Sequence, residues 1–328
     1  MIPFSDVLLG FSVVLSDGHL LYIAIGVLLG TVVGALPGLG ASTGVALLLS
    51  VIFGMDFFPA IFMLIGVYTG ATFGGAVSSI LLNTPGTPGA TLTALEGYKL
   101  TEKGRGGPAL GIAALSSLIG LVLSAFLMML FTPILVKMAL TFGPAEYTVL
   151  ILLGLSTLAF IGNAPILLTL ISASLGFFVG IMGMDTMGGF VRFDFGVPSL
   201  IDGVSFIPAA MGLFAMGEVL VNLDKRRQGN VVTEQRVSTS VFPSREDLKE
   251  CFPAQMKGSF IGFFVGILPA AGQTIAAFIS YTFSSKTSKR QKEYGTGLLE
   301  GVAASESGNS ASCGGALLPT LTLGVPGS

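Results

Sequence analysis

Residues 26–44, GVLLGTVVGALPGLGASTG, decide the fold expected of this chain. The stretch is apolar enough for a membrane, but Pro37 and the glycines around it interrupt it. Proline removes a backbone donor and clashes with the preceding turn, and glycine permits dihedral angles closed to other residues. In hydrocarbon, irregular backbone is tolerated only where protein buries it or where it lines a polar cavity. The interruption is therefore a candidate binding site.

The same design returns 232 positions later, in residues 258–272, GSFIGFFVGILPAAG. The matching pairs are Gly26 with Gly258, Gly30 with Gly262, Gly34 with Gly266, Leu36 with Leu268, Pro37 with Pro269, Gly40 with Gly272 and Ser42 with Thr274. A second pair of motifs follows. Residues 74–76 match 314–316 at an offset of 240, and residues 82–87, LNTPGT, match 323–328, LGVPGS, at an offset of 241. Each copy thus carries two backbone breaks, and we expect a duplicated fold in which the four breaks meet.

Composition defines the class of protein. Of the 328 residues, 52% are hydrophobic and 10% are charged, and the mean hydropathy is +0.85. These values predict an integral membrane protein. Because the alternating strands of a membrane barrel are absent from the sequence, we expect the all-α polytopic class. No dense basic tract suggests a nucleic-acid partner. The two cysteines and the single His19 offer neither a metal-ligand pattern nor a catalytic set, so we expect no metal, no catalytic residue and no enzyme activity.

The apolar segments predict the order of the membrane elements. Residues 4–15 are too short to cross a bilayer and are expected at its interface. Broken elements are expected at 20–54, at 57–95 with its break at 83–89, and at 258–284. Four ordinary spans are predicted at about 109–136, 146–161, 165–184 and 206–222. The expected organisation is a first transmembrane repeat at 1–222, a polar cytoplasmic linker at 223–257 and the start of a second, incomplete repeat at 258–328.

Basic residues predict the orientation. Fourteen of the 16 lysines and arginines lie in residues 96–107, 223–257 and 285–300, which we therefore place in the cytoplasm. The broken element at 20–54 has no basic flank, whereas the one at 258–284 has basic residues on both sides. Each is expected to be a re-entrant hairpin, and the two would open to opposite sides, as in the inverted-topology repeats of secondary transporters. The alternatives are plain helices with a proline kink. The break at Pro37 is either a hairpin tip or an unwound hinge, and the break at 83–89 takes the other role.

Broken helices expose backbone groups that bind ions. The N-terminus of a half-helix presents free N–H groups that suit carboxylates, and a C-terminus presents carbonyls that suit cations. The predicted substrate site is formed by residues at and just after the breaks: Pro37, Gly38, Gly40, Ser42, Thr43, Asn83, Thr84, Gly86, Thr87, Gly272, Gln273, Thr274, Pro326, Gly327 and Ser328.

Residues 305–312, SESGNSAS, form a polar run in an apolar region. Buried polar groups in lipid are costly unless they are satisfied, so the run is a candidate ion pathway. Glu306, Asn309 and Ser310 are the candidate ion-coupling residues. The alternative for Glu306 is a position at the water interface.

Five sequence runs carry a family resemblance: residues 34–40, 70–86, 103–115, 300–310 and 323–328. Together they resemble the large membrane subunit of the tripartite tricarboxylate transporters (TctA type). The resemblance implies a bacterial inner-membrane, multi-pass symport subunit that imports citrate-like tricarboxylates or other small carboxylates. It also implies co-transport of Na⁺ or H⁺ without a cofactor, a small membrane subunit and a periplasmic substrate-binding protein as partners. The family's large subunit is longer, so the match lacks its C-terminal part. The alternative function is a channel or a non-transporting scaffold subunit.

Overall fold

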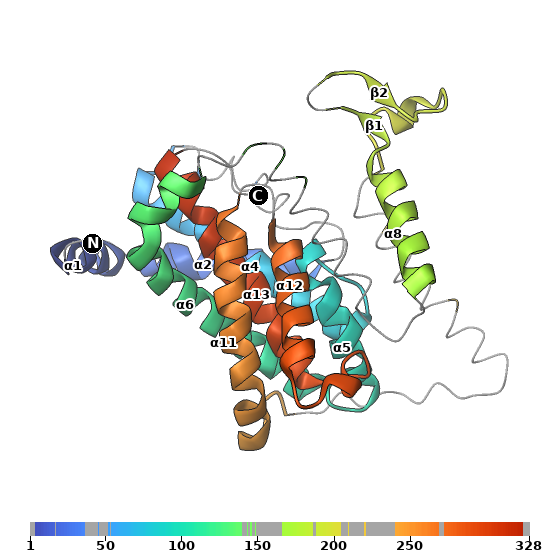
Figure 1. Ribbon diagram of the computed structural model, residues 1–328. Helices are drawn as coiled ribbons and strands as arrows, with labels where there is room; N and C mark the ends of the chain where they lie inside the picture. Colours follow the sequence, from blue (N-terminus) through green and yellow to red (C-terminus); the bar gives the residue numbers. More distant parts are fainter. Residues whose placement is uncertain are drawn as a thin grey trace.

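The computed structural model describes residues 4–16, 18–36, 54–139, 166–185, 188–204, 240–268 and 272–323, with a few isolated positions between them. The described chain is mainly helical (Figure 1). Its helices are α1 (Phe4–Leu15), α2 (His19–Ala35), α4 (Phe57–Leu82), η1 (Pro88–Ala90), α5 (Thr91–Glu102), α6 (Gly106–Ala139), α8 (Ile166–Gly180), η2 (Pro198–Leu200), α11 (Arg245–Ile267), α12 (Gly272–Thr287), η4 (Gln291–Glu293) and α13 (Leu299–Leu323). Strands β1 (Gly183–Met184) and β2 (Val191–Arg192) form a small antiparallel hairpin.

Helices α2 and α4 pack through glycine. A Cβ built on Gly30 of α2 would lie 2.3 Å from the carbonyl oxygen of Val67, and one built on Gly34 would lie 2.1 Å from that of Ala71. The glycines of α4 face α2 in the same way, since a Cβ on Gly74 would lie 2.3 Å from the carbonyl oxygen of Thr31. The two backbones therefore touch, as small residues permit in membrane helices.

Helices α11 and α13 repeat this packing. A Cβ on Gly262 would lie 2.2 Å from the carbonyl oxygen of Gly308, and one on Gly266 would lie 2.4 Å from that of Ser312. Gly315 of α13 faces the Phe263 carbonyl at 2.4 Å. Each of these contacts corresponds to one between α2 and α4, with an offset of 232 residues from α2 to α11 and of 241 residues from α4 to α13. Gly74 is therefore equivalent to Gly315 in the packing. The offset of 240 predicted for the Gly-Gly-Ala motif is one residue too small.

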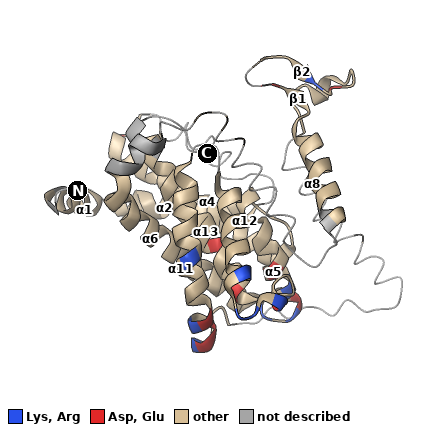
Figure 2. Ribbon diagram, in the orientation of Figure 1, with Lys and Arg blue, Asp and Glu red and all other residues tan. Residues whose placement is uncertain are grey.

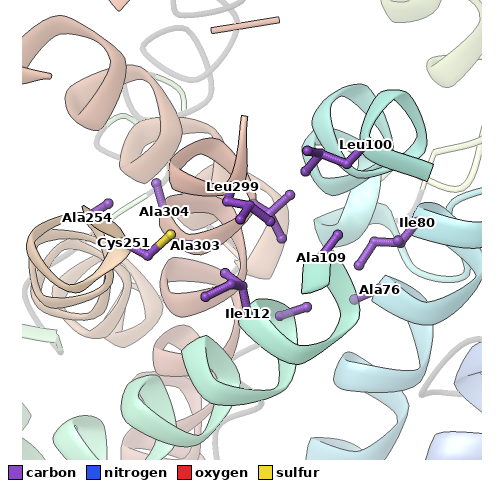
Figure 3. Close-up of a cluster of buried hydrophobic side chains, with 12 residues drawn as sticks. Ala76, Ile80, Leu100, Ala109, Ile112, Cys251, Ala254, Leu299, Ala303 and Ala304 are labelled. Carbon is purple, nitrogen blue, oxygen red and sulfur yellow. The ribbon is translucent and has the colours of Figure 1, made fainter. Parts of the chain in front are cut away.

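Helix α13 lies inside the bundle and contacts α4, α5, α6, α11 and α12. A buried cluster of mostly small side chains joins α13 to α4, α5, α6 and α11 (Figure 3). It includes Ala76 of α4, Leu100 of α5, Ile112 of α6, Cys251 of α11 and Ala303 of α13. The alanines of α4, α6, α11 and α13 let these helices approach one another closely, and the polar run of α13 is buried in the interior.

The described parts of the three basic segments lie at one end of the bundle (Figure 2). Arg105 pairs with Asp247 at 2.7 Å, and Arg290 pairs with Glu250 at 2.9 Å. Burial alone would raise the pKa of the Asp247 carboxyl, but hydrogen bonds from Arg105 and Ser244 outweigh it and hold that pKa below its ordinary value. The shared end agrees with the prediction that these segments face the same side.

Two helix boundaries differ from expectation. Helix α11 begins at Arg245, 13 residues before the predicted start at Gly258, because Ser244 and Asp247 form a capping box there. Helix α5 continues through Glu102, although the charged loop was expected to begin at Glu96. Glu96 is fully buried and hydrogen-bonded, so its charge does not mark a loop.

The predicted span at 109–136 lies within α6, and α8 covers most of the span predicted at 165–184. The spans predicted at 146–161 and 206–222 lie almost wholly outside the described residues. His19 is buried at the start of α2, where its Nδ1 lies 2.6 Å from the Val13 carbonyl oxygen and its ring packs on Phe62. The sequence beside Asp17 and Gly18 predicts a solvated interfacial residue, and the structure instead buries His19 between α1 and α4.

Candidate functional site

The chain reverses direction after α4. Asn83 adopts the left-handed conformation, with φ of 53°, and ends the helix. The following segment runs back along α4: the Thr84 amide donates to the Ser78 carbonyl, and the Gly86 amide donates to the Gly75 carbonyl, each at 3.4 Å. Helix α5 then returns toward the charged end. The break at 83–89 is therefore a turn that folds back along the C-terminal part of α4 as far as Gly75.

The break between α11 and α12 is a hairpin tip. Lys257 of α11 bonds to Thr287 of α12 at 2.9 Å, and the Ser280 hydroxyl donates to the Gly258 carbonyl at 3.2 Å. The two helices therefore run side by side in opposite directions. This result favours the hairpin over a kinked span for the second broken element. The chain also turns back at 83–89, and the break at Pro37, with which that break was expected to differ, lies outside the described residues.

Described parts of three breaks meet. A Cβ on Gly89, in η1, would lie 2.2 Å from Asn309 Oδ1 of α13 and 3.2 Å from Gln273 Cβ at the start of α12. A Cβ on Gly86 would lie 2.1 Å from the carbonyl oxygen of Gly34, near the end of α2. Glycine is required at both positions because backbone or buried side chains occupy the space.

A polar face of α13 lines this meeting point. Glu306 and Asn309 are fully buried, three residues apart on α13, and therefore lie on one face. The Thr93 hydroxyl of α5 donates to Glu306 Oε1 and lies 3.1 Å from the Ser305 hydroxyl. In the described part of the chain, no lysine or arginine is within ion-pair distance of Glu306. Glu306 therefore does not face solvent from the surface of the bundle.

Unsatisfied polar atoms gather here. Glu306 Oε2, both polar atoms of the Asn309 amide and Thr87 Oγ1 are buried without a hydrogen-bond partner. A buried polar group without a partner costs about 1–3 kcal/mol, and a buried charge costs more. Three of these four atoms are oxygens. Together with the start of α12, whose first N–H groups have no partner within the helix, these atoms are a candidate site for a cation and a polar ligand.

A second polar cluster lies one helical turn away. Gln273 Nε2 donates to the Thr72 hydroxyl of α4 and to the Cys313 sulfur of α13, both at 2.9 Å. Thr72 Oγ1 and Cys313 Sγ are 3.4 Å apart and differ by 241 in sequence. Equivalent positions of the two glycine-packed helices therefore touch each other, and Gln273 holds them together.

Replacing Thr72 with cysteine is expected to allow a disulfide with Cys313. The Thr72 hydroxyl already lies 3.4 Å from the Cys313 sulfur, and disulfides need Cβ atoms about 4 Å apart. Oxidation in a Cys251→Ala background, followed by mass spectrometry of linked peptides, measures this. Thr69→Cys, one turn earlier on α4, is the matched control. Cross-linking at position 69 but not at 72 would contradict the contact.

Of the predicted site residues, Gln273 and Asn309 both lie against Gly89, and Glu306 lies one turn before Asn309 on α13. Gly86 and Thr87 belong to the same turn as Gly89 but lie against Gly75 of α4. Thr84 instead caps α4 by donating to the Leu82 carbonyl, and Ser310 faces Gly120 of α6. Asn83 makes the turn itself, while Gly272 and Thr274 begin α12 beside Gln273. The remaining predicted residues lie outside the described part of the chain: Pro37, Gly38, Gly40, Ser42, Thr43, Pro326, Gly327 and Ser328.

Sequence reasoning missed Thr72, Thr93 and Cys313. The two threonines sit in apolar helical segments where a hydroxyl is easily satisfied by the helix itself. For Thr93, the available signal was its place just after a predicted break. The contact with Cys313 depends on how α4 crosses α13, which no local pattern reveals.

The fold defines a helical membrane protein. Among the described residues, residues 57–82 and 106–132 are long and apolar enough to cross a bilayer, and α1 with α2 forms a bent pair that would make a third span. The chain belongs to the tripartite tricarboxylate transporter TctA family, which it matches over residues 20–328. This confirms the predicted resemblance, and the family is one of transporters rather than enzymes.

Two relatives come from Agrobacterium vitis. The chain is 36% identical over 322 residues to an uncharacterized 52.8 kDa protein in the TAR-I ttuC' 3' region, and the alignment covers 98% of this chain and 64% of that protein. It is 43% identical over 65 residues to an uncharacterized protein in the TAR-II ttuC' 3' region, covering 20% of this chain and 27% of that one. The chain thus spans less than two thirds of the longer match. No solved structure matches it.

Proposed function

We propose that this chain forms the translocation pathway of a secondary importer of citrate-like tricarboxylates or other small carboxylates, driven by Na⁺ or H⁺. A periplasmic substrate-binding protein would deliver the carboxylate, a small membrane subunit would complete the carrier, and the assembly would lie in the bacterial inner membrane. Family membership supports transport. The observation that carries the proposal is the group of unsatisfied buried oxygens on Thr87, Glu306 and Asn309 where the breaks meet.

In this proposal the anionic substrate and the driving cation bind at different places in the site. The substrate carboxylates would be bound at the start of α12, where Gly272, Gln273 and Thr274 present N–H groups and the positive end of the helix dipole. The cation would be bound at Glu306, whose second oxygen has no partner. A bound cation would offset the charge of the substrate in a site that lacks lysine and arginine within its described part.

We further propose that α2 with α4 and α11 with α13 are two copies of one unit in inverted orientation. The recurring glycine contacts and the touching equivalents Thr72 and Cys313 support this reading. A local two-fold relation would pass near that contact. Secondary transporters with inverted repeats bind their substrates at the interface between the copies, which is where Gln273 lies.

Uptake into proteoliposomes tests the function. The full-length subunit is reconstituted with its small membrane subunit, the binding protein is added outside, and radiolabelled citrate is supplied under a Na⁺ gradient, a pH gradient or neither. We expect uptake that requires the binding protein and one gradient. Uptake that persists after both gradients are collapsed would favour a channel, and binding-protein association without uptake of any tricarboxylate would favour a scaffold.

A further inference from the structure

Glu96 is a buried carboxylate outside the site described above. It lies on α5 and is 0% exposed. Its Oε1 accepts hydrogen bonds from the Tyr281 hydroxyl at 2.6 Å and the Gly295 amide at 2.5 Å. Its Oε2 accepts from the amides of Gly297 at 2.8 Å and Leu298 at 2.9 Å. Four donors therefore satisfy this carboxylate completely.

Three of the four donors come from the turn before α13, and the fourth, the Tyr281 hydroxyl, comes from α12. Gly297 and Leu298 immediately precede the first residue of α13, and a carboxylate is stabilised by the free amides and the dipole at a helix N-terminus. A Cβ built on Gly301, in the first turn of α13, would lie 2.8 Å from Glu96 Oε1 and Cγ. The glycine leaves room for the carboxylate, so α5 is held directly against the start of α13.

The same face of α5 reaches the cation site. Thr93 precedes Glu96 by three residues, so the two side chains share one face of the helix. Thr93 donates to Glu306 Oε1, and this contact leaves Glu306 Oε2 without a partner. Helix α5 is thus joined to α13 twice, through Glu96 at its first turn and through Thr93 at Glu306.

We infer that Glu96 is a positioning residue for cation coupling. Its hydrogen bonds fix the position of α5 along α13, and this position lets the Thr93 hydroxyl donate to Glu306 Oε1. Glu306 Oε2 is then left free to bind the cation. The inference rests on the proposed function. Glu96 itself does not contact the cation. A shift of α5 along α13 would move Thr93 away from Glu306 and leave a buried carboxylate with two unsatisfied oxygens.

Glu96→Gln and Thr93→Val test this assignment in the reconstituted carrier. The glutamine keeps the size of the side chain but turns an N–H₂ group toward the donors, and the valine removes only the hydroxyl. Na⁺ is titrated as NaCl against choline chloride, and H⁺ is titrated by external pH. We expect each variant to raise the half-saturating concentration of the driving cation about tenfold, with the citrate KM at saturating cation changed less than about twofold.

The double variant identifies the route of the effect. Because Glu96 is inferred to act through Thr93, the combined loss of cation affinity should not exceed that of the larger single variant. Glu102→Gln, an exposed acid at the end of the same helix, is the matched control and should behave as wild type. Additive losses in the double variant would overturn the inference.

A purely structural role gives a different result. Glu96→Gln would then lower the melting temperature while leaving the cation dependence of uptake and the stabilisation of the purified protein by Na⁺ or H⁺ unchanged, and this outcome would overturn the inference. Where Glu96→Gln does not reach the membrane, Tyr281→Phe removes one of the four donors and should give a smaller shift in the same direction; no shift would overturn it. Absence of uptake by the wild-type carrier would instead contradict the proposed function.

Discussion

Replacing Glu306 with glutamine is expected to abolish cation-dependent uptake. The glutamine can still accept the Thr93 hydroxyl, so α13 should pack as before, but the free oxygen loses its charge. Losing one partner of a buried charge interaction costs about 2–5 kcal/mol, which corresponds to about a 30-fold or greater loss of cation affinity. Citrate uptake by proteoliposomes, titrated with Na⁺ and with pH, measures the loss.

Glu300→Gln is the matched control for this prediction. Glu300 lies in the first turn of the same helix and bonds to Ser288, away from the meeting point of the breaks. Its loss should leave the cation dependence unchanged. If Glu306→Gln were to import citrate with wild-type dependence on Na⁺ and pH, the assignment of the cation site to Glu306 would be wrong.

Replacing Gly262 with alanine is expected to destabilise the protein by about 3 kcal/mol. The new Cβ would lie 2.2 Å from the Gly308 carbonyl oxygen, and backbone atoms on both sides cannot move apart without separating α11 from α13. Inserting atoms into a well-packed interior typically costs about 1–3 kcal/mol, and rigid backbone places this site at the upper end. Thermal unfolding of the purified protein in detergent measures the change.

Gly30→Ala provides an independent check, because its Cβ would lie 2.3 Å from the Val67 carbonyl oxygen in the equivalent contact of α2 with α4. A similar loss is expected there. Gly176→Ala in α8 is the control, since nothing lies within 4 Å of its Cβ, and alanine favours a helix over glycine by about 1 kcal/mol. Equal stability of the Gly262 and Gly176 variants would contradict the close packing of α11 and α13.

The sequence pattern predicted the features that depend on residues close to one another in the chain. Proline and glycine predicted the break before Gly272, and helical periodicity added little in α2, α4, α6 and α8, which are apolar along nearly their whole length. The hairpin at that break is the arrangement that the basic flanks favoured. Glu306 was identified because a carboxylate in an apolar region is costly wherever it lies.

Other features depended on packing between distant segments. Glu96 reads as the start of a charged loop, yet four donors from α12 and the turn before α13 make its burial favourable. Ser310 reads like Asn309, but a rotation of about 100° per residue turns it toward α6. The correct register of the repeat, with Gly74 equivalent to Gly315, emerged from which backbones touch.

The sequence by itself determined that this protein is a helical membrane protein of the TctA type and that its chain breaks after α4 and before α12, because composition, proline and glycine act on the chain within a few residues. The tertiary structure alone decided that re-entrant turns meet beside α13 and that unsatisfied oxygens of Thr87, Glu306 and Asn309 gather there. The physical reason is that this convergence depends on glycine-mediated contacts between helices far apart in the chain, and the identity of one residue does not specify its partner.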